Sequence, residues 1–184
     1  MCSRFENTRP PEELLGRFGL SVPPDVVPDE VRPTDPALVI LAGPRVAVLR
    51  WGLEVSWDRR PVINARLEGI ERKPTFAPHL RSRCLVPATA WFEWRKEGRA
   101  RLRHRFSPPG GQPFALAGLA CGGRFVILTC AAAPAVEGVH DRMPLVLPEP
   151  LEAPWIDPET PFASLAPLLG PWTGALVVEG DPTH

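Results

Sequence analysis

Residues 84–95, with the sequence CLVPATAWFEWR, carry the strongest β-strand signal in the chain. The segment is mostly apolar and aromatic, and in a strand successive side chains point to opposite faces. That alternation places Trp91 and Glu93 on one face and Phe92 and Trp94 on the other. We therefore predict one strand over these twelve residues, with further strands arranged around it.

Glu93, which lies between two tryptophans, has two interpretations. Apolar surroundings raise the pKa of a carboxyl group and make it a proton donor or acceptor near neutral pH. Alternatively, Glu93 is an ordinary edge-strand glutamate in contact with water. The residues alone leave both interpretations open.

Apolar segments at hairpin spacing lie on both sides of this strand. We predict strands at 37–41 and 45–51, which the turn Ala42-Gly43-Pro44 joins, a hairpin of 114–120 and 124–131, and a strand and tail at 174–184. A strand at 99–106 would carry Arg99, Arg101, Arg103 and Arg105 on one face, where they either bind phosphates or keep an edge strand soluble. This pattern predicts an α+β fold, a mainly antiparallel, barrel-like β-sheet core with a few short peripheral helices.

The helices that we expect are short and peripheral. The first would cover residues 8–18, with Thr8 as its cap and Gly19 after its last turn. Residues 22–36, rich in proline and aspartate, are expected to form an irregular connector. A short helix is predicted at 75–83, and proline-interrupted helices at 149–169.

Length and composition are typical of one globular domain over residues 1–184. No run approaches the roughly 20 apolar residues of a membrane helix, and Arg4, Glu6 and Arg9 interrupt any signal peptide, so we expect a cytoplasmic protein with no membrane partner. Nineteen arginines against two lysines suggest a bacterial source. The four cysteines form no CxxC pair and are interpreted as reduced thiols, so we expect no metal and no other cofactor.

The net charge of zero conceals an uneven distribution. Residues 36–148 hold seventeen basic and eight acidic side chains, whereas residues 149–184 hold six acidic and none basic. A positive central segment is compatible with nucleic-acid binding, although blocks of charge are commonly solvated faces.

The amino-terminal residues Met1-Cys2-Ser3-Arg4 suggest a nucleophile. Removal of Met1 would leave Cys2 with an α-amine of pKa about 7.7–8.0 beside a thiol of pKa about 8.5. These two nucleophiles suit an aldehyde, since the amine can form an imine and the thiol can then close a thiazolidine ring. The alternative is an early cysteine without a role, because short motifs match by chance.

Two further polar groups interrupt apolar segments. Asn64 and Arg66 follow an apolar dipeptide at a strand end, where they either form a site or are a turn asparagine and a surface arginine. His140 lies at a strand entrance, where it either titrates near pH 7 or forms a structural pair with Asp141.

Five segments, in this order, resemble the SOS response-associated peptidase (SRAP) family, which is known for capturing abasic sites in single-stranded DNA. They are Met1–Phe5, Trp51–Leu53, Ile63–Arg66, the strand Cys84–Trp94 and His140–Pro144. The resemblance covers about the first 150 residues. Because the chain ends soon after Val178, we expect the family's usual terminal segment to be missing.

The resemblance implies a catalytic set around Cys2. Cys2 would form a thiazolidine crosslink with the ring-opened aldehyde of an abasic site, while Asn64 would orient the amine or the sugar oxygens. Glu93 would shuttle protons, and His140 would assist sugar-ring opening as an acid. The family also implies a DNA-repair enzyme of the SOS response with autopeptidase (hydrolase, protease) and abasic-site lyase activities, which we expect to be monomeric and associated with the nucleoid.

The resemblance also implies a set of DNA-binding residues. Phosphates would contact Arg4, Arg66 and Arg142, bases would stack on Trp51 and Trp94, and Pro33 would act as a wedge. The chain departs from the family pattern at Ser3, where glycine is common, and at Glu30, whose carboxylate would repel a phosphate.

Two other functions remain open. An amino-terminal cysteine also defines amino-terminal-nucleophile amidohydrolases, including class II glutamine amidotransferases, which attack carboxamides. The second function is a non-catalytic module that binds single-stranded DNA through tryptophans and an arginine face. Glutamine hydrolysis would identify the first, and unchanged products in Cys2→Ala the second.

Overall fold

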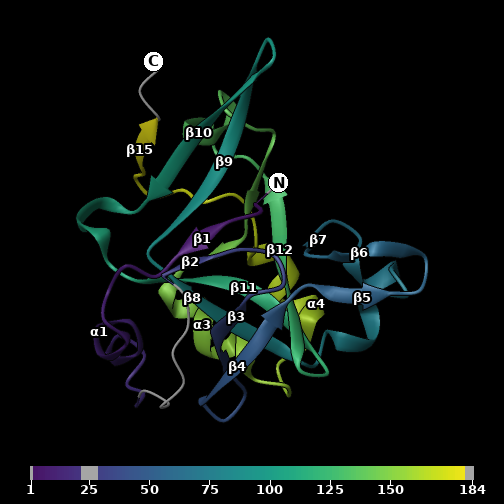
Figure 1. The fold of residues 1–184 in the computed structure, drawn as a ribbon. Coiled ribbons are helices and arrows are strands. Elements are labelled where there is room, and N and C mark those ends of the chain that lie inside the picture. Colours follow the sequence, from purple (N-terminus) through teal and green to yellow (C-terminus); the bar gives the residue numbers. More distant parts are fainter. Residues whose placement is uncertain (1, 22–28, 181–184) are drawn as a thin grey trace.

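A barrel of β-strands forms the centre of the computed structural model, which describes residues 2–21 and 29–180 (Figure 1). Its sheet contains eight strands: β3 (Pro36–Leu41), β4 (Arg45–Trp51), β7 (Asn64–Arg66), β8 (Arg83–Ala88), β11 (Phe114–Cys121), β12 (Arg124–Ala131), β13 (Arg142–Pro144) and β14 (Val146–Leu147). Strands β3, β4, β12, β11 and β8 pair in a closed circuit, because β12 pairs with both β4 and β11. The closed circuit leaves these strands without an open edge.

Most strand pairs are antiparallel. In the described part of the chain, the parallel pairs are β12 with β4 and β12 with β7. The mainly antiparallel, barrel-like sheet with few short helices that the sequence predicts is therefore confirmed. The hairpins β3–β4 and β11–β12 lie close to the predicted residues.

A second sheet lies beside the barrel and holds the amino terminus. Its order is β15 (Val177–Gly180), β10 (Ala100–Ser107), β9 (Ala90–Glu97), β1 (Phe5–Glu6) and β2 (Glu30–Val31). Strands β9 and β10 form a long hairpin that projects from the barrel (Figure 1). Because β1 pairs with β9, the residues just before Phe5 are held close to Glu93 and Trp94.

The predicted single strand Cys84–Arg95 is wrong, because the segment divides between the two sheets. Strand β8 belongs to the barrel and β9 to the second sheet, with Thr89 between them. The backbone N–H and the hydroxyl of Thr89 both donate to the carbonyl oxygen of Glu6, at 2.8 and 3.0 Å. These two bonds hold the chain where it passes from one sheet to the other.

The helices are short, as predicted, but several bounds differ. They are α1 (Pro11–Gly16), η1 (Ile70–Arg72), η2 (Ala77–His79), η3 (Pro109–Gly111), α2 (Pro134–Glu137), α3 (Glu149–Ile156), α4 (Phe162–Leu165) and η4 (Ala166–Leu168). A small hairpin of β5 (Leu53–Val55) and β6 (Asp58–Val62) lies between β4 and β7 in sequence. In the described ranges no helix is long and apolar enough to cross a membrane.

Three local predictions need correction. Thr8 does not cap α1, because its N–H donates to the Thr89 hydroxyl and the helix begins after Pro10. The connector predicted at 22–36 contains strand β2, while residues 22–28 lie outside the described part. The helix predicted at 75–83 is reduced to η2, because Arg83 begins β8 and donates to the carbonyl oxygens of α3 and neighbouring loops.

Candidate active site

The site is built around Cys2, which lies just before β1 of the second sheet. The Cys2 side chain is fully buried, and its Sγ lies 3.5 Å from the carbonyl oxygen of Arg4. That carbonyl oxygen also accepts a 3.0 Å hydrogen bond from the N–H of Phe92 on β9. The segment from Cys2 to β1 therefore lies along β9.

Asn64 connects Cys2 to the barrel. It begins β7, which pairs with β12, and its side-chain Nδ2 donates a 2.6 Å hydrogen bond to the carbonyl oxygen of Cys2. The Oδ1 of the same amide is buried and accepts no hydrogen bond from any described residue. A buried acceptor normally has a donor, so this oxygen is available to a donor that arrives at the site.

Glu93 on β9 is the buried carboxyl group of the site. Its side chain is only 1% exposed, so Glu93 is not an edge-strand glutamate in contact with water. Burial raises the pKa of Glu93 to about 7, with a smaller contribution from the charge of Asp141. Burial and then the charge of Glu93 raise the pKa of the Cys2 thiol well above its usual range. Glu93 can therefore gain or lose a proton near neutral pH, beside a thiol that stays protonated.

His140 follows α2 and precedes β13. Its Nδ1 accepts a 2.9 Å hydrogen bond from the N–H of Arg142 and lies 2.8 Å from Oδ1 of Asp141. Burial lowers the pKa of His140, which favours the neutral ring at pH 7. The two contacts at Nδ1 favour opposite tautomers of the neutral ring, because the Arg142 N–H needs an acceptor there and the Asp141 carboxylate needs a donor.

A cavity of about 420 Å³ brings Glu93 and His140 together. The residues that line it are Ser3, Glu93, Trp94, Lys96, Arg101, Val139, His140 and Asp141. Its walls thus come from the amino terminus, from the β9–β10 hairpin and from the segment before β13. Two groups that can transfer protons face a space that a small polar molecule can enter.

The predicted DNA-binding residues occupy different environments. The guanidinium of Arg4 lies 5.5 Å from the ring centre of Trp94, and Arg66 at the end of β7 is exposed. Pro33 is half-buried in the turn that follows β2. Arg142, by contrast, makes two 2.8 Å bonds to Glu68 and one of 2.7 Å to the carbonyl oxygen of Thr129. A phosphate would have to displace Glu68 to reach Arg142.

The base-stacking role predicted for Trp51 is wrong, because the side chain is fully buried. Its Nε1 donates to the carbonyl oxygen of Ile63 at 2.8 Å. Phe5 and Phe125 pack against the indole at centroid distances of 5.2 and 6.4 Å. Trp51 is a core residue with no face open to a base.

The structure also shows a charged cluster that the predicted site did not include. Glu30 on β2 forms ion pairs with Arg4, Arg32 and Arg103. The alternation of arginines in β10 indicated that Arg103 and Arg105 share a face, but not that Glu30 and Glu6 are their partners. In the described ranges no group of three or more potential ligands could hold a metal ion.

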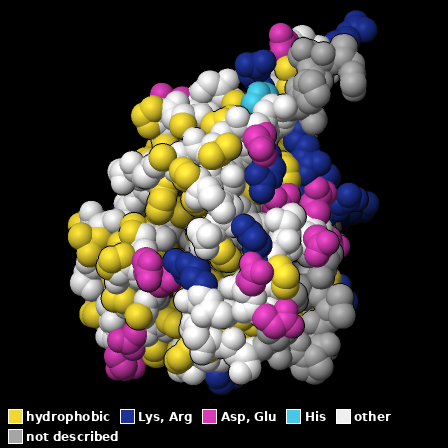
Figure 2. All heavy atoms as spheres, turned by 90° about the vertical axis from the view of Figure 1, so that its left-hand side faces the viewer, with side chains coloured by type: hydrophobic (Ala, Val, Ile, Leu, Met, Phe, Trp, Pro, Cys, Tyr) yellow, Lys and Arg dark blue, Asp and Glu magenta, His cyan; other side chains and the backbone are white. Residues whose placement is uncertain are grey.

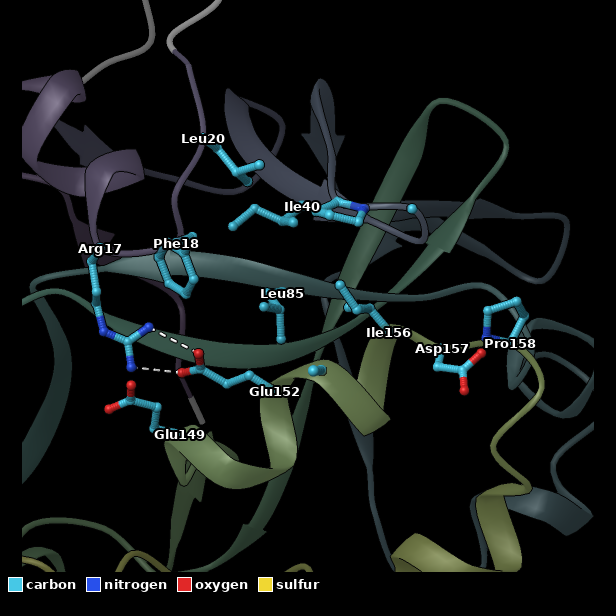
Figure 3. Close-up of a pocket in the computed structure, with 13 residues that line it drawn as sticks. Arg17, Phe18, Leu20, Ile40, Leu85, Glu149, Glu152, Ile156, Asp157 and Pro158 are labelled. Atoms are coloured by element: carbon cyan, nitrogen blue, oxygen red, sulfur yellow. Dashed lines mark hydrogen bonds and ion pairs between the residues drawn. The ribbon is translucent and has the colours of Figure 1, made fainter.

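A second cavity, of about 430 Å³, lies between α1, β3, β8 and α3 (Figure 3). Its wall is largely apolar, and Arg17 donates two hydrogen bonds of 2.9 and 2.8 Å to the carboxylate of Glu152 across one end. None of the predicted site residues lines this cavity. We therefore place the candidate chemistry at the polar cavity that Ser3, Glu93 and His140 line, although Cys2, which is buried, and Asn64 are not among its lining residues.

The sequence is similar to known proteins along most of its length. The sequence model of the SOS response associated peptidase (SRAP) family matches residues 1–179. The abasic site processing protein YedK of Escherichia coli is 29% identical over 187 residues, which cover 86% of this chain and 81% of that protein. The abasic site processing protein YoqW of Bacillus subtilis is 28% identical over 189 residues, with the same coverage. A solved structure from Bacteroides thetaiotaomicron is 24% identical and has a TM-score of 0.84 over 97% of this chain and 91% of that one, so the two share a fold.

Proposed function

The chain belongs to the SOS response associated peptidase (SRAP) family, and from this premise we propose that it processes abasic sites in single-stranded DNA through a covalent bond to Cys2. Several relatives carry the name abasic site processing protein. The reactive form begins at Cys2, after removal of Met1. Its electrophile is the aldehyde of the ring-opened abasic sugar.

The proposed reaction forms two bonds to the aldehyde carbon. The α-amine of Cys2 adds to the carbonyl, and loss of the oxygen as water gives an imine. The Cys2 sulfur then adds to the same carbon, and the thiol proton is transferred to the nitrogen. The product is a five-membered thiazolidine, and one water molecule is released. No oxidant, metal or further reactant is required.

Glu93 is the proton carrier that this sequence of steps needs. A pKa of about 7 allows the carboxyl group to protonate the departing hydroxyl and then, as a carboxylate, to accept the thiol proton. This second role matters because burial disfavours the Cys2 thiolate, so the proton must leave as the carbon–sulfur bond forms.

Asn64 and His140 complete the proposed site. Asn64 holds the Cys2 carbonyl through Nδ2, and its Oδ1 can accept a hydrogen bond from the new α-amine. His140 lines the cavity with Glu93 and can donate a ring N–H to the sugar oxygen as the ring opens. Both lie on elements other than β9, so the sugar would be held from several sides.

Arg4, Arg66, Trp94 and Pro33 are proposed to contact the DNA strand. Arg4 and Trp94 lie together beside the cavity, where a guanidinium and an indole can hold a phosphate and a stacked base. Arg142 joins this set only where a phosphate replaces Glu68. Such contacts do not read sequence, as expected for a protein that recognises a missing base.

The hydrogen bond from Asn64 to Cys2, next to the buried Glu93, is the observation that carries the proposal. In the test, protein whose measured mass shows that Met1 is absent is mixed with a single-stranded oligonucleotide that contains one abasic site. We expect an adduct that survives a denaturing gel, with the mass of protein plus DNA minus one water.

Two controls are needed in the same experiment. Borohydride reduction of the abasic site beforehand removes the aldehyde and should prevent the adduct. Glutamine hydrolysis is measured in parallel, because a glutaminase activity without an adduct would favour the amidohydrolase. Absence of any shifted band with the mature protein would disprove the crosslinking function, and a shortened DNA strand would identify lyase activity instead.

A further inference from the structure

Glu30 holds three arginines on the outer face of the second sheet. Its carboxylate bonds to Nη1 of Arg4 at 3.1 Å, to Nη2 of Arg32 at 3.3 Å and to Nη2 of Arg103. These partners are 26, 2 and 73 residues away in sequence, so the fold gathers them. One carboxylate among three guanidinium groups leaves the cluster with a net charge of +2.

Two of these guanidinium groups are also positioned by aromatic rings of β9. Arg103 lies 3.7 Å from the ring centre of Phe92, and Arg4 lies 5.5 Å from that of Trp94. The Nε atoms of Arg4 and Arg103 are buried and have no hydrogen-bond partner among the described residues. The arginines are thus fixed in place by stacking, and Glu30 alone does not satisfy their donors.

The cluster adjoins the cavity of the candidate site. Arg4 is two residues from Cys2, and Trp94, which lies against Arg4, lines the cavity together with Glu93. On the face that Figure 2 shows, basic and acidic side chains are interspersed and do not form one continuous positive surface. A strand with its damaged sugar in the cavity would bring a neighbouring phosphate to the cluster.

A carboxylate and a phosphodiester resemble each other at such a site. Each carries one negative charge and offers two oxygens to guanidinium donors. Although burial acts in the opposite direction, the hydrogen bond from Arg103 and the charges of Arg103 and Arg4 hold the pKa of Glu30 below its ordinary value. Glu30 is therefore ionised at neutral pH and blocks the site that a phosphate would use.

We propose that Arg4, Arg32 and Arg103 form a binding site for a backbone phosphate of single-stranded DNA, and that Glu30 occupies this site in the free protein as an internal competitor. The inference rests on the proposed function, since it places the phosphate next to the abasic sugar. It assigns Arg32 and Arg103 to DNA binding and gives Glu30 the opposite effect. DNA must displace the Glu30 carboxylate, which weakens binding of every strand, intact or damaged.

The test measures the affinity of Glu30→Gln for an intact, fluorescently labelled oligonucleotide without an abasic site, over a range of salt concentrations. We expect binding at low salt to tighten by about three- to tenfold, and the slope of log K against log salt to steepen by about 0.7, the value for one additional phosphate contact on a single strand. Glu159→Gln is the matched control. It adds the same unit of charge but breaks the exposed Arg81–Glu159 pair, which includes no cluster residue, so it should bind as the wild type does.

Arg32→Gln provides the reciprocal arm. Arg32 is 61% exposed, so the fold does not depend on it, and its loss should weaken binding several-fold. Unchanged or weaker binding by Glu30→Gln, or unchanged binding by Arg32→Gln, would overturn the inference. Crosslinking to an abasic strand is measured separately. If the affinity shifts but no adduct forms, the proposed chemistry fails and the phosphate site stands. If an adduct forms but the affinity does not shift, the phosphate site fails and the proposed chemistry stands.

Discussion

The side-chain amide of Asn64 donates a 2.6 Å hydrogen bond to the carbonyl oxygen of Cys2. This bond joins a barrel strand to the amino terminus and sets the distance between the two sheets at the candidate nucleophile. Asn64→Asp keeps the shape but replaces the donor with a carboxylate that repels the carbonyl oxygen. We expect the rate of adduct formation to fall at least tenfold, as gel time courses would show, with a loss of about 1–3 kcal/mol in unfolding free energy. An Asn64→Asp protein that reacts at the wild-type rate would remove Asn64 from the site.

Glu93→Gln tests proton transfer. Gln fills the same space and cannot exchange a proton, so adduct formation should slow by roughly 10²-fold. The wild-type rate should change with pH around 7, where Glu93 titrates, and the variant should lack that inflection. Affinity for intact single-stranded DNA is measured as the control and should stay nearly the same. Equal rates in the two proteins would exclude Glu93 from the mechanism.

Burial of Glu93 should also make stability depend on pH. A carboxyl group whose pKa rises on folding favours the folded state while it is protonated. This contribution is fully present below the ordinary pKa of 4.5 and is lost as the pH rises through about 7. At about 1.4 kcal/mol per pKa unit, the wild type should lose about 3 kcal/mol relative to Glu93→Gln across that window. Urea unfolding at several pH values measures this difference, and parallel curves for the two proteins would contradict it.

Trp51 and Trp94 offer a matched comparison of core and surface. Trp51→Ala removes a side chain packed between Phe5 and Phe125 and should cost about 3–5 kcal/mol of stability. Trp94→Ala should change stability far less but weaken binding of single-stranded DNA by about 1–3 kcal/mol, the value of one stacked base. Thermal unfolding and fluorescence titration separate the two effects. A larger stability loss in Trp94→Ala than in Trp51→Ala would reverse these assignments.

Local patterns predicted the barrel hairpins because each of their strands is an apolar run bounded by a turn. They could not predict the division at Thr89, because the alternation continues through it. The hydrogen bonds that hold the chain there are donated by Thr89 to the carbonyl oxygen of Glu6, which is distant in sequence. Nor could local patterns predict the burial of Trp51, which depends on Phe5 and Phe125, distant in sequence. Glu30 departed visibly from the family pattern, but only the fold shows its partners Arg4, just before β1, and Arg103 on β10.

Cys2→Ala separates the two nucleophiles that the proposed reaction needs. The mature variant keeps an α-amine, so it should still form an imine with the abasic aldehyde, but it lacks the sulfur that closes the ring. Because an imine is reversible in water, we expect no adduct on a denaturing gel unless borohydride is added during the reaction to reduce it. The wild type should give the same band with and without that treatment.

The mass of the Cys2→Ala protein must first show that Met1 is absent, since otherwise neither nucleophile is presented as proposed. A borohydride-dependent band in the variant would locate the first bond at the terminal amine and the second at the sulfur. A gel-stable adduct of the variant without reduction would instead require another residue to hold the sugar. In that case the buried Cys2 thiol would be a core side chain, and the proposed chemistry would fail.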